Sequence, residues 1–440
     1  MTKPITAVLA GAGNRGAEAY GRYALDHPDE LQFVAVAEPH PKRRERFAQA
    51  HDIPAAQRFT TWEELFAAGK LADTAFITTQ DQMHVKPTLT ALELGYDILL
   101  EKPMAPTLAE NVRLVQAAER TDQLLQIGHV LRYTTFFSKL HEIIKSGRLG
   151  KIISVEHREN VSYWHMSHSF VRGNWRNRTL SSPMILAKCC HDLDILYWNL
   201  GPCAELNSFG SLLHYRAENA PEGAPERCTD GCPVADECPW NAINLYQKKL
   251  PLQQHLTDPE EVANYYGWPI SVITENHTPE GIRHALETGP YGRCVYHCDN
   301  DVVDNQIVNL QMESGATVAL FMQGHSHREG RTMRYDGTRA TLRGSFFFDE
   351  QRLEIHDHLT GEVEIIDTTP GPIGGSGHGG GDAGLMRAFI RAVRHPETAM
   401  TTARESLESH LMAFAADQAR VENQIVNMAA FRQQAEQLTA

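Results

Sequence analysis

Strand-like apolar runs alternate with helical patterns over the first 128 residues of the chain. The helical patterns cover residues 84–94 and 108–121. The apolar runs cover residues 5–9, 31–38, 73–79, 97–101 and 123–128. Alternation of this kind is typical of a parallel, doubly wound sheet that packs helices on both faces. The pattern therefore predicts an N-terminal α/β domain over residues 1–128.

Beyond Gly128 this alternation stops. Residues 151–163 alternate polar and apolar positions, as a half-solvated strand does. Two hairpins are predicted further on, over 306–324 with a turn at Gly315 and over 353–367 with a turn at Gly361. The rest of the chain is therefore expected to form a second domain that is rich in strands.

Two other segments complete this second domain, which we place at residues 129–440. The stretch 404–438 carries Ala, Leu, Glu and Gln at helical spacing and predicts one long packed helix. Residues from about 216 to about 300 are rich in proline and weakly patterned. We interpret them as an insertion.

The composition limits the partners of such a protein. The chain has 440 residues and 42% hydrophobic content, which is enough for two domains with large cores. Its net charge of −14 argues against nucleic acid as a partner. The N-terminus runs straight into a predicted strand, and no run approaches the ~18 apolar residues that would cross a bilayer. We therefore expect a cytoplasmic protein that acts on small molecules, with no membrane partner.

A glycine-rich turn follows the first predicted strand. Gly11, Gly13 and Gly16 form a GxGxxG motif between that strand and an Ala-rich helical pattern. The first glycine permits a tight turn, the second lets the backbone approach a pyrophosphate, and the third lets helix and strand pack closely. The helix N-terminus then faces the anion. In this context the motif predicts a Rossmann-type dinucleotide site.

An acidic residue ends the second predicted strand. Glu38 follows the motif by about twenty residues, where a carboxylate can bind a ribose 2′-hydroxyl. This position favours NAD. Arg43 and Arg44 keep NADP open, because a guanidinium nearby can accept a 2′-phosphate instead.

The segment 99–106, LLEKPMAP, places a lysine just after an apolar strand. Parallel sheets bind their ligands at the carboxyl ends of the strands. Lys102 is therefore expected to face the nicotinamide half of the cofactor crevice.

Glu101-Lys102-Pro103, with the segment 78–103 that ends in it, resembles the Gfo/Idh/MocA family of glucose–fructose oxidoreductases and inositol dehydrogenases. The resemblance is clear over residues 1–200 and loose beyond. It implies a second domain with a large open, mainly antiparallel sheet that often serves oligomerisation, so we expect a homodimer or homotetramer. It also implies a lysine near the nicotinamide, a proline that is often in a cis peptide, and a sugar, cyclitol or related polyol as substrate. We assign cofactor binding to Gly11, Gly13, Asn14, Arg15, Gly16, Glu38, Thr79, His84, Glu101 and Lys102.

A second cluster lies in the segment 185–201. The family pattern here is Asp-x-Gly-x-His-x-x-Asp, and His191 and Asp194 match its last two polar positions. A histidine can take the hydroxyl proton as hydride leaves the same carbon. Asp194, one helical turn further on, can hold the imidazole or a sugar hydroxyl.

The match to that pattern is partial. Ala187 replaces the first Asp, and Cys189 replaces the Gly. Either Lys188 takes over part of the role of the missing Asp, or the proton follows a different path.

Arg132 and Tyr133 follow the last predicted strand of the first domain and match a family position that reaches over the cofactor. Tyr133 can orient a hydroxyl or, with a lowered pKa, act as a base; a core tyrosine with a satisfied hydroxyl is the alternative. The stretch 163–178 is dense in tryptophan and arginine, which suits a sugar with an anionic substituent, or else a basic rim or oligomer contact. The substrate-binding candidates there are Trp164, His165, Arg172, Trp175 and Arg176.

Several cysteines gather in the predicted insertion. Their spacing does not match the commonest zinc knuckle, but four thiolates on loops suit tetrahedral zinc, and a structural metal would help to order the insertion. An iron–sulfur cluster and free cysteines are the alternatives. The predicted zinc ligands are Cys228, Cys232, Cys238 and Cys294, with Cys298 as the other choice for the fourth position.

The segment 375–384, GSGHGGGDAG, carries only His378 and Asp382 as functional side chains. Its glycines suit a hinge or a substrate lid, and we count His378 among the substrate-binding residues. The segment is also similar to the His-Gly-Gly-Met-Asp sequence of the NAD-dependent α-N-acetylgalactosaminidases, a glycosidase branch of the same superfamily.

Three functions are consistent with these residues. The first is a sugar or polyol dehydrogenase, in which Lys102 or His191 handles the hydroxyl proton while hydride passes to NAD⁺. The second is an NAD-dependent glycoside hydrolase that oxidises C3 transiently, with Tyr133 as the base at C2. The third is a catalytically silent NAD-binding regulator. We place the dehydrogenase first.

Overall fold

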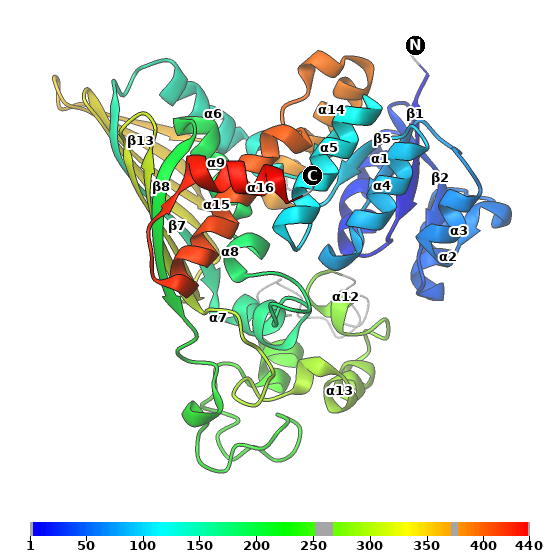
Figure 1. Ribbon diagram of the computed structural model, residues 1–440. Helices are drawn as coiled ribbons and strands as arrows, with labels where there is room; N and C mark the ends of the chain where they lie inside the picture. Colours follow the sequence, from blue (N-terminus) through cyan, green and yellow to red (C-terminus); the bar gives the residue numbers. More distant parts are fainter. Residues whose placement is uncertain (1–2, 251–266, 371–376, 439–440) are drawn as a thin grey trace.

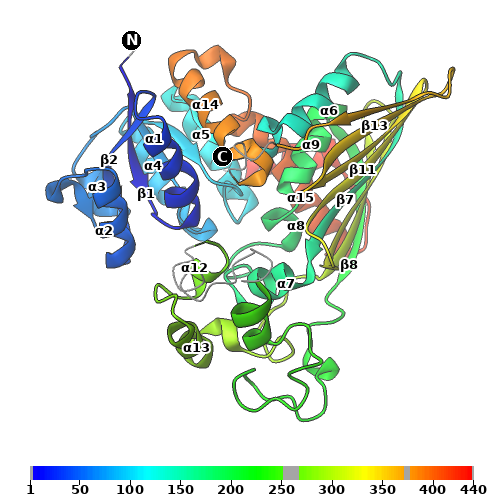
Figure 2. The same ribbon diagram turned by 180° about the vertical axis from the view of Figure 1, so that it is seen from behind.

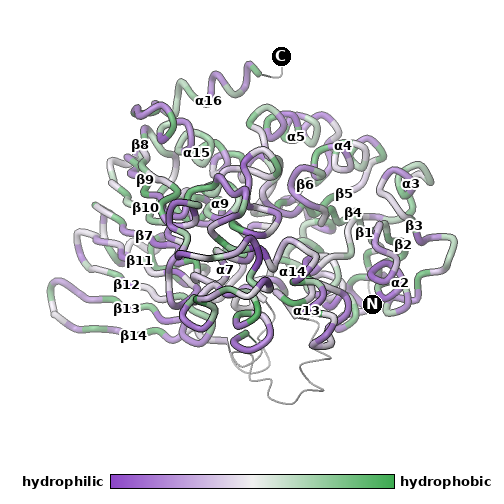
Figure 3. The backbone as a smooth tube through the Cα atoms, turned by 90° about the horizontal axis from the view of Figure 1, so that it is seen from below, coloured by the Kyte–Doolittle hydropathy of each residue, from purple (hydrophilic) through white to green (hydrophobic). Residues whose placement is uncertain are grey.

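The fold is known from a computed structural model that describes residues 3–250, 267–370 and 377–438. Two sheets lie on opposite sides of the molecule, and helices fill the space between them (Figures 1 and 3). The first sheet is parallel and the second is mainly antiparallel, so the predicted fold class is confirmed. Within the described ranges, no helix is both long and apolar enough to cross a bilayer.

The first sheet has six parallel strands in the order β3-β2-β1-β4-β5-β6. Its central strands are buried on both faces, which explains why they read as continuous apolar runs in the sequence. The strands are β1 (Ile5–Ala10), β2 (Leu31–Ala37), β3 (Arg58–Phe59), β4 (Thr74–Ile77), β5 (Asp97–Leu100) and β6 (Leu125–Ile127). The connecting helices are η1 (Asn14–Gly21), α1 (Arg22–Asp26), α2 (Pro41–Ala50), α3 (Trp62–Ala67), α4 (Val85–Glu93) and α5 (Leu108–Thr121).

The second sheet has nine strands in the order β14-β13-β12-β11-β7-β10-β9-β8-β15. All neighbours are antiparallel except the central pair β7 and β10, which is parallel. The predicted strand over 151–163 and both predicted hairpins are confirmed. The strands are β7 (Ile152–Ser162), β8 (Cys203–Ser211), β9 (Asn305–Met312), β10 (Thr317–Ser326), β11 (Gly330–Gly337), β12 (Ala340–Phe347), β13 (Gln351–Asp357), β14 (Val363–Asp367) and β15 (Val426–Asn427).

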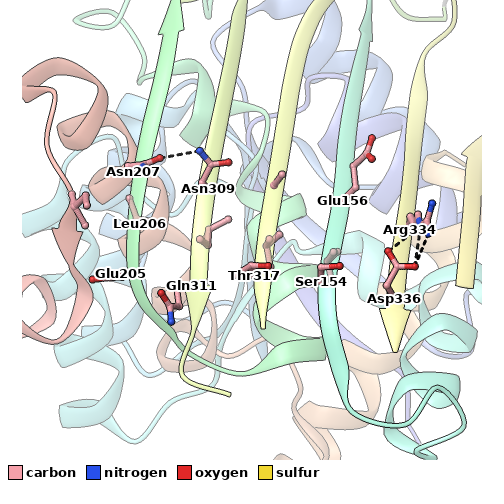
Figure 4. Close-up of a pocket in the computed structure, with 15 residues that line it drawn as sticks. Ser154, Glu156, Glu205, Leu206, Asn207, Asn309, Gln311, Thr317, Arg334 and Asp336 are labelled. Carbon is pink, nitrogen blue, oxygen red and sulfur yellow. Dashed lines mark hydrogen bonds and ion pairs between the residues drawn. The ribbon is translucent and has the colours of Figure 1, made fainter. Parts of the chain in front are cut away.

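The two faces of this second sheet differ in character. Burial alternates along β9 and β10, because successive side chains of a strand point to opposite faces. The helices α6 (Thr135–Lys145), α9 (Cys190–Leu200) and α15 (Ala403–Glu422) lie on the inner face (Figures 1 and 2). The outer face carries polar side chains and a shallow hollow of about 540 Å³, which Figure 4 shows. Asn309 donates to Asn207 there at 3.0 Å.

The C-terminal part of the chain returns to the first sheet. In the helix α14 (Gly381–Arg394), Phe389 packs edge-on against Phe76 of β4 with ring centroids 5.4 Å apart. The predicted single helix over 404–438 is wrong, because α15 ends at Glu422 and the next residue, Asn423, has a left-handed φ of 53° that stops the helix. The short strand β15 and the helix α16 (Met428–Gln437) follow.

The expected insertion connects β8 to β9 and lies at one end of the molecule, below both sheets in Figures 1 and 2. It contains the short helices η7 (Asn244–Lys249), α12 (Ile270–Ile273) and α13 (Pro279–Thr288). A small apolar cluster of its own, including Leu245 and Leu286, holds it together. Residues 251–266 of the insertion lie outside the described residues.

A buried ion pair joins the segment that follows β6, the last strand of the first sheet, to the helix α9 of the second domain. Arg132, directly after β6, donates from Nε and Nη2 to the two oxygens of Asp194 on α9, at 2.7 and 2.6 Å. Both side chains are at most 2% exposed. Removing one partner of such a pair leaves the other charge buried and uncompensated.

We predict that Arg132→Leu lowers the free energy of unfolding by about 3–5 kcal/mol, because the Asp194 carboxylate loses its buried partner. Urea unfolding followed by circular dichroism measures the change. Arg404→Leu is the control: its pair with Glu119 is half exposed on both sides, so it should cost at most about 1 kcal/mol. Equal losses in the two variants would show that the Arg132–Asp194 pair does not join the domains.

Candidate active site

The glycine loop after β1 has the geometry of a dinucleotide loop. Gly11 has a φ of +99°, and a Cβ at Gly16 would lie 2.2 Å from the carbonyl oxygen of Gly11. A side chain is therefore excluded at both positions. A Cβ at Gly13 would meet no atom within 4 Å, so the space beside this backbone is open to a ligand. The helix η1 begins at the next residue, Asn14.

Glu38 lies beside this loop at the end of β2. Its carboxylate accepts from the backbone N–H of Ala12 at 2.8 Å and from that of His40 at 2.9 Å. The competing arginines are occupied: Arg43 pairs with Glu275 of the insertion at 2.6 Å, and Arg44 donates to the carbonyl oxygen of Glu38. The carboxylate is thus placed to meet a ribose hydroxyl, and the residues present fit NAD.

A cavity of about 160 Å³ opens at the carboxyl ends of β4, β5 and β6. It combines residues of the first sheet with residues from the stretch 163–178, from α9 and from the glycine-rich segment. The lining residues are Arg15, Thr78, Thr79, Asp81, His84, Glu101, Lys102, Gly128, Val130, Trp175, His191 and His378.

Lys102 reaches across the boundary between the two domains. Its Nζ donates to the carbonyl oxygen of Ala187 at 2.9 Å, and its backbone N–H donates to the Glu101 carboxylate at 3.1 Å. An ammonium group has three donors, so two remain for the cavity. The Lys102–Pro103 peptide bond is cis, as the resemblance implied.

His191 lies in the first turn of α9 and is 5% exposed. Burial lowers the pKa of its imidazole well below the ordinary value, and the nearby charge of Lys102 lowers it further. Its Nδ1 has no hydrogen-bond partner among the described residues. The ring is therefore a neutral imidazole that can accept a proton.

Arg15 links the cofactor loop to the glycine-rich segment. Its guanidinium pairs with Glu101 at 2.7 Å and with Asp382 at 2.9 Å, and Asp382 in turn lies 3.2 Å from Nδ1 of His378. Burial alone would raise the pKa of Asp382, but Arg15 and His378 outweigh it and hold the pKa below its ordinary value. Asp382 is therefore a carboxylate.

Comparison with known proteins agrees with this geometry. Residues 5–129 match the description "Oxidoreductase family, NAD-binding Rossmann fold", and residues 141–231 match "Oxidoreductase family, C-terminal alpha/beta domain". The chain belongs to the Gfo/Idh/MocA family. It is thus a member of a family of NAD-binding oxidoreductases.

Individual relatives are distant. The Bacillus subtilis protein YteT is 22% identical over 375 residues, which cover 81% of each chain. The inositol 2-dehydrogenase of Corynebacterium glutamicum is 28% identical over 207 residues, 46% of this chain and 56% of that enzyme. An oxidoreductase from Agrobacterium radiobacter, solved with NAD⁺, L-tartaric acid and magnesium, has a TM-score of 0.68 at 15% identity and covers 97% of this chain and 99% of its own. That likeness shows a common fold.

Two positions that match the Gfo/Idh/MocA pattern have structural partners instead of facing the cavity. Asp194 is held by Arg132 as described above, so neither is free for the imidazole or for substrate. The hydroxyl of Tyr133 lies 2.9 Å from Thr401 and 3.2 Å from Gln126, and burial raises its pKa to about 12. The condition for Tyr133 to act as a base, a lowered pKa, is not met, and the alternative of a satisfied core tyrosine fits.

The stretch 163–178 contributes one residue to the cavity. Trp175 lines it and donates from its indole to Asp81 at 2.9 Å. Arg172 is fully buried and donates to the carbonyl oxygens of Arg293 and Trp240, both at 2.7 Å. Burial of this kind excludes Arg172 from substrate contact.

The other candidates of that stretch also bind protein groups. Trp164 packs against Trp268 with centroids 5.1 Å apart. Arg176 pairs with Asp299 at 2.8 Å. None of these side chains lines the cavity within the described part of the chain.

Lys188 and His165 meet at a shared carboxylate behind the cavity wall. Lys188 lies 2.9 Å from Glu329 and 3.3 Å from Glu159, and His165 lies 2.9 Å from Glu329. Burial lowers the pKa of Lys188, but the two carboxylates outweigh it and raise the pKa above its ordinary value. Lys188 is therefore a charged partner of these two carboxylates, and it follows Ala187, whose carbonyl oxygen accepts from Lys102.

The predicted zinc site is not supported. Cys228, Cys232, Cys238 and Cys294 do line one closed cavity of about 10 Å³ beside Arg172. Among the described residues, however, no group of three or more His, Cys, Asp or Glu side chains has an arrangement that could hold a metal. All eight cysteines are free of disulfides.

Asp81, Thr78 and the Asp382–Arg15 contact were not assigned to the site from the sequence. The i, i+4 spacing of His378 and Asp382 at the start of a helical pattern is a signal that could have indicated their contact. Asp81 and Thr78 carry no such signal, since a polar residue after a strand is common in loops.

We predict that Glu38→Ala weakens NAD binding by about ten- to a hundredfold, because a hydrogen bond to a charged group contributes about 1.5–3 kcal/mol. NADP binding should weaken less, since its 2′-phosphate is repelled by this carboxylate. Calorimetric titration with both dinucleotides measures the difference, and Glu18→Ala, an exposed residue of η1, is the control. Tighter binding of NADP than of NAD by the unchanged protein would contradict the assignment of Glu38.

We also predict that the imidazole of His191 stays unprotonated as the pH falls from about 8 to about 6.5, the ordinary histidine pKa. A lowered pKa keeps the neutral base form through this window, and protonation occurs only below it. The surroundings that cause this are burial, Lys102, His129, Arg331 and His378. NMR titration of ¹⁵N-histidine-labelled protein, with His191→Gln to assign the signal, checks the midpoint. A midpoint at or above about 6.5 would refute it.

Proposed function

We propose that the protein is an NAD-dependent dehydrogenase that oxidises a ring C–OH of a sugar or cyclitol. The observation that carries the proposal is the meeting of Lys102 and His191 in one cavity, at the edge of the NAD-binding sheet. The relatives named inositol 2-dehydrogenase support the substrate class. Asp81, Thr79 and Trp175 line the same cavity and suit hydroxyl groups and sugar C–H surfaces.

The roles of the two residues follow from their states. NAD⁺ supplies the hydride acceptor when it is bound. His191, a neutral imidazole in the lining of this cavity, accepts the proton of the hydroxyl that is oxidised. Lys102, fixed by Ala187, donates to the same oxygen while it becomes a carbonyl oxygen. The Glu101 carboxylate accepts from the backbone N–H of Lys102 and so helps to fix the lysine.

NAD-dependent glycoside hydrolysis is the second candidate. The observation that favours it is the position of His378, from the glycine-rich segment, in the same cavity as Lys102. A regulator without activity is a third and weaker candidate, since such a protein needs neither residue. The predicted homo-oligomer and cytoplasmic location stay predictions; the polar outer face of the second sheet offers a surface for the former (Figure 4).

An assay with cyclitols, aldoses and aryl glycosides separates these functions. A dehydrogenase accumulates NADH in step with substrate loss and releases no aglycone. A hydrolase releases aglycone without net NADH and places solvent deuterium at C2 of the sugar. Failure of every compound to react would favour the regulator.

We predict that Lys102→Met lowers kcat/KM by about 10²–10³, the usual cost of removing a donor to an oxygen that develops negative charge. The melting temperature should stay close to that of the unchanged protein, because Lys102 lines the cavity and is not part of the hydrophobic core. Lys86→Met, on the exposed face of α4, is the matched control. Wild-type turnover in the Lys102 variant would show that this lysine is an ordinary loop residue without a role in catalysis.

A further inference from the structure

The cavity holds a histidine, His378, that simple dehydrogenation leaves unused. His378 lines it together with Lys102 and His191, and its ring centroid lies 6.3 Å from that of His191. Its side chain is 38% exposed, whereas His191 is almost fully buried. The ring is therefore the more solvent-exposed of the two imidazoles in this cavity.

The backbone of His378 has a φ of +55°, a conformation that residues other than glycine rarely adopt. Gly379 and Gly380 continue with positive φ into the first turn of α14. Strained backbone of this kind clusters at functional sites, where the surrounding structure holds it. The strain presents the imidazole over the cavity instead of along the helix.

A buried carboxylate orients this imidazole. Nδ1 of His378 lies 3.2 Å from Oδ1 of Asp382, which is 3% exposed. Asp382 is fixed in turn by two contacts with Arg15, at 2.9 and 3.1 Å. Nη1 of Arg15 lies 3.4 Å from the same Nδ1. In the tautomer whose Nδ1–H donates to the Asp382 carboxylate, Nε2 is a free acceptor. Among the described residues, Nε2 has no hydrogen-bond partner.

We propose that His378, positioned by Asp382, is a second acid–base group, which removes a proton from the carbon next to the carbonyl that dehydrogenation creates. The inference rests on the proposed function, which supplies that carbonyl. The C–H bond breaks, its electron pair forms the C=C bond of an enolate, and the proton passes to Nε2. Lys102 stabilises the negative oxygen, and return of the proton restores the ketone.

This assignment gives the two ends of the cavity different tasks. Lys102 and His191 serve the oxygen of the carbon that is oxidised. His378 serves the neighbouring carbon, where a carbonyl makes the C–H acidic. A site with both groups can exchange, epimerise or eliminate at that neighbour, and this extends the chemistry beyond net oxidation. It also supplies the base that Tyr133 cannot supply.

The test uses two ketones, 2-keto-myo-inositol and 3-keto-glucose, with purified full-length protein in D₂O. Mass spectrometry measures deuterium beside the carbonyl, and NADH consumption in a parallel sample measures hydride transfer to the same ketone. The protein should catalyse both reactions above the rate in buffer. In His378→Gln the exchange should fall by about 10²–10⁴ and by more than hydride transfer falls. Lys102→Met should lower both rates, because Lys102 donates to the same oxygen in both reactions.

Three controls make the result specific. His395→Gln is the first control. This side chain is 65% exposed, follows the C-terminal end of α14 and does not line the cavity, so the change should affect neither rate. Asp382→Glu should retain more exchange than Asp382→Asn, as expected for a positioning carboxylate. Because Asp382 is buried, the melting temperature of its variants is measured alongside, while the partly exposed His378 provides the variant that keeps the fold.

The outcomes separate this inference from the proposed function. Hydride transfer without exchange, or exchange that survives His378→Gln, would overturn the role of His378 and leave the dehydrogenase intact. Neither hydride transfer nor exchange on either ketone would overturn the proposed substrate class, and the role of His378 with it. Exchange that depends on His378 and Asp382 would support both.

Discussion

The Arg15 guanidinium, held between Glu101 and Asp382, joins the three segments from which the active site is built. Arg15 belongs to the glycine loop, Glu101 precedes the cavity lysine, and Asp382 begins the helix α14. Both carboxylates are less than 10% exposed. Without the cation between them, two buried negative charges would face each other, which costs several kcal/mol. One cation therefore sets the relative positions of the loop, the lysine and the glycine-rich segment.

Apolar packing provides the base on which this ionic contact rests. Phe389 of α14 packs on Phe76, which in turn contacts Tyr20 and Phe33 of the first sheet and its helices. The hydrophobic effect brings α14 to the sheet, because it depends on area and not on direction. The charges then select one orientation of the helix, since a guanidinium binds carboxylates in a fixed geometry.

The fold was predictable where the pattern is local. The strands of the first sheet, the glycine loop and the two hairpins are each encoded within a short stretch, so periodicity and turn residues sufficed. The prediction of a single C-terminal helix was wrong because one residue, Asn423, adopts a left-handed conformation. The residues around it give no sign of this in the sequence. The strand order of the nine-stranded sheet could not be deduced, because the sequence of a strand does not show which other strand pairs with it.

The site was predictable in part for the same reason. Lys102 and the glycines follow strands whose ends define a ligand edge, so position alone indicated their role. The roles predicted for Arg132, Arg172 and Tyr133 do not fit the structure. Residue type does not show whether a polar side chain faces a cavity or a buried partner. Asp194 satisfied a family motif and still serves an ion pair. Only the packing of distant segments decides between these outcomes.

The parallel pairing of β7 with β10 has a consequence for how the protein is made. Gln323 and Asn160, on these two strands, are 163 residues apart in the chain. A nascent chain can complete the first sheet from residues 5–127 while the ribosome is still adding the insertion. The centre of the second sheet has to wait until β10 has emerged, and loop closure over such a distance is slow. During this interval β7 is an unpaired edge, and its charged side chains, Glu156, Arg158 and Glu159 among them, protect it from pairing with another copy.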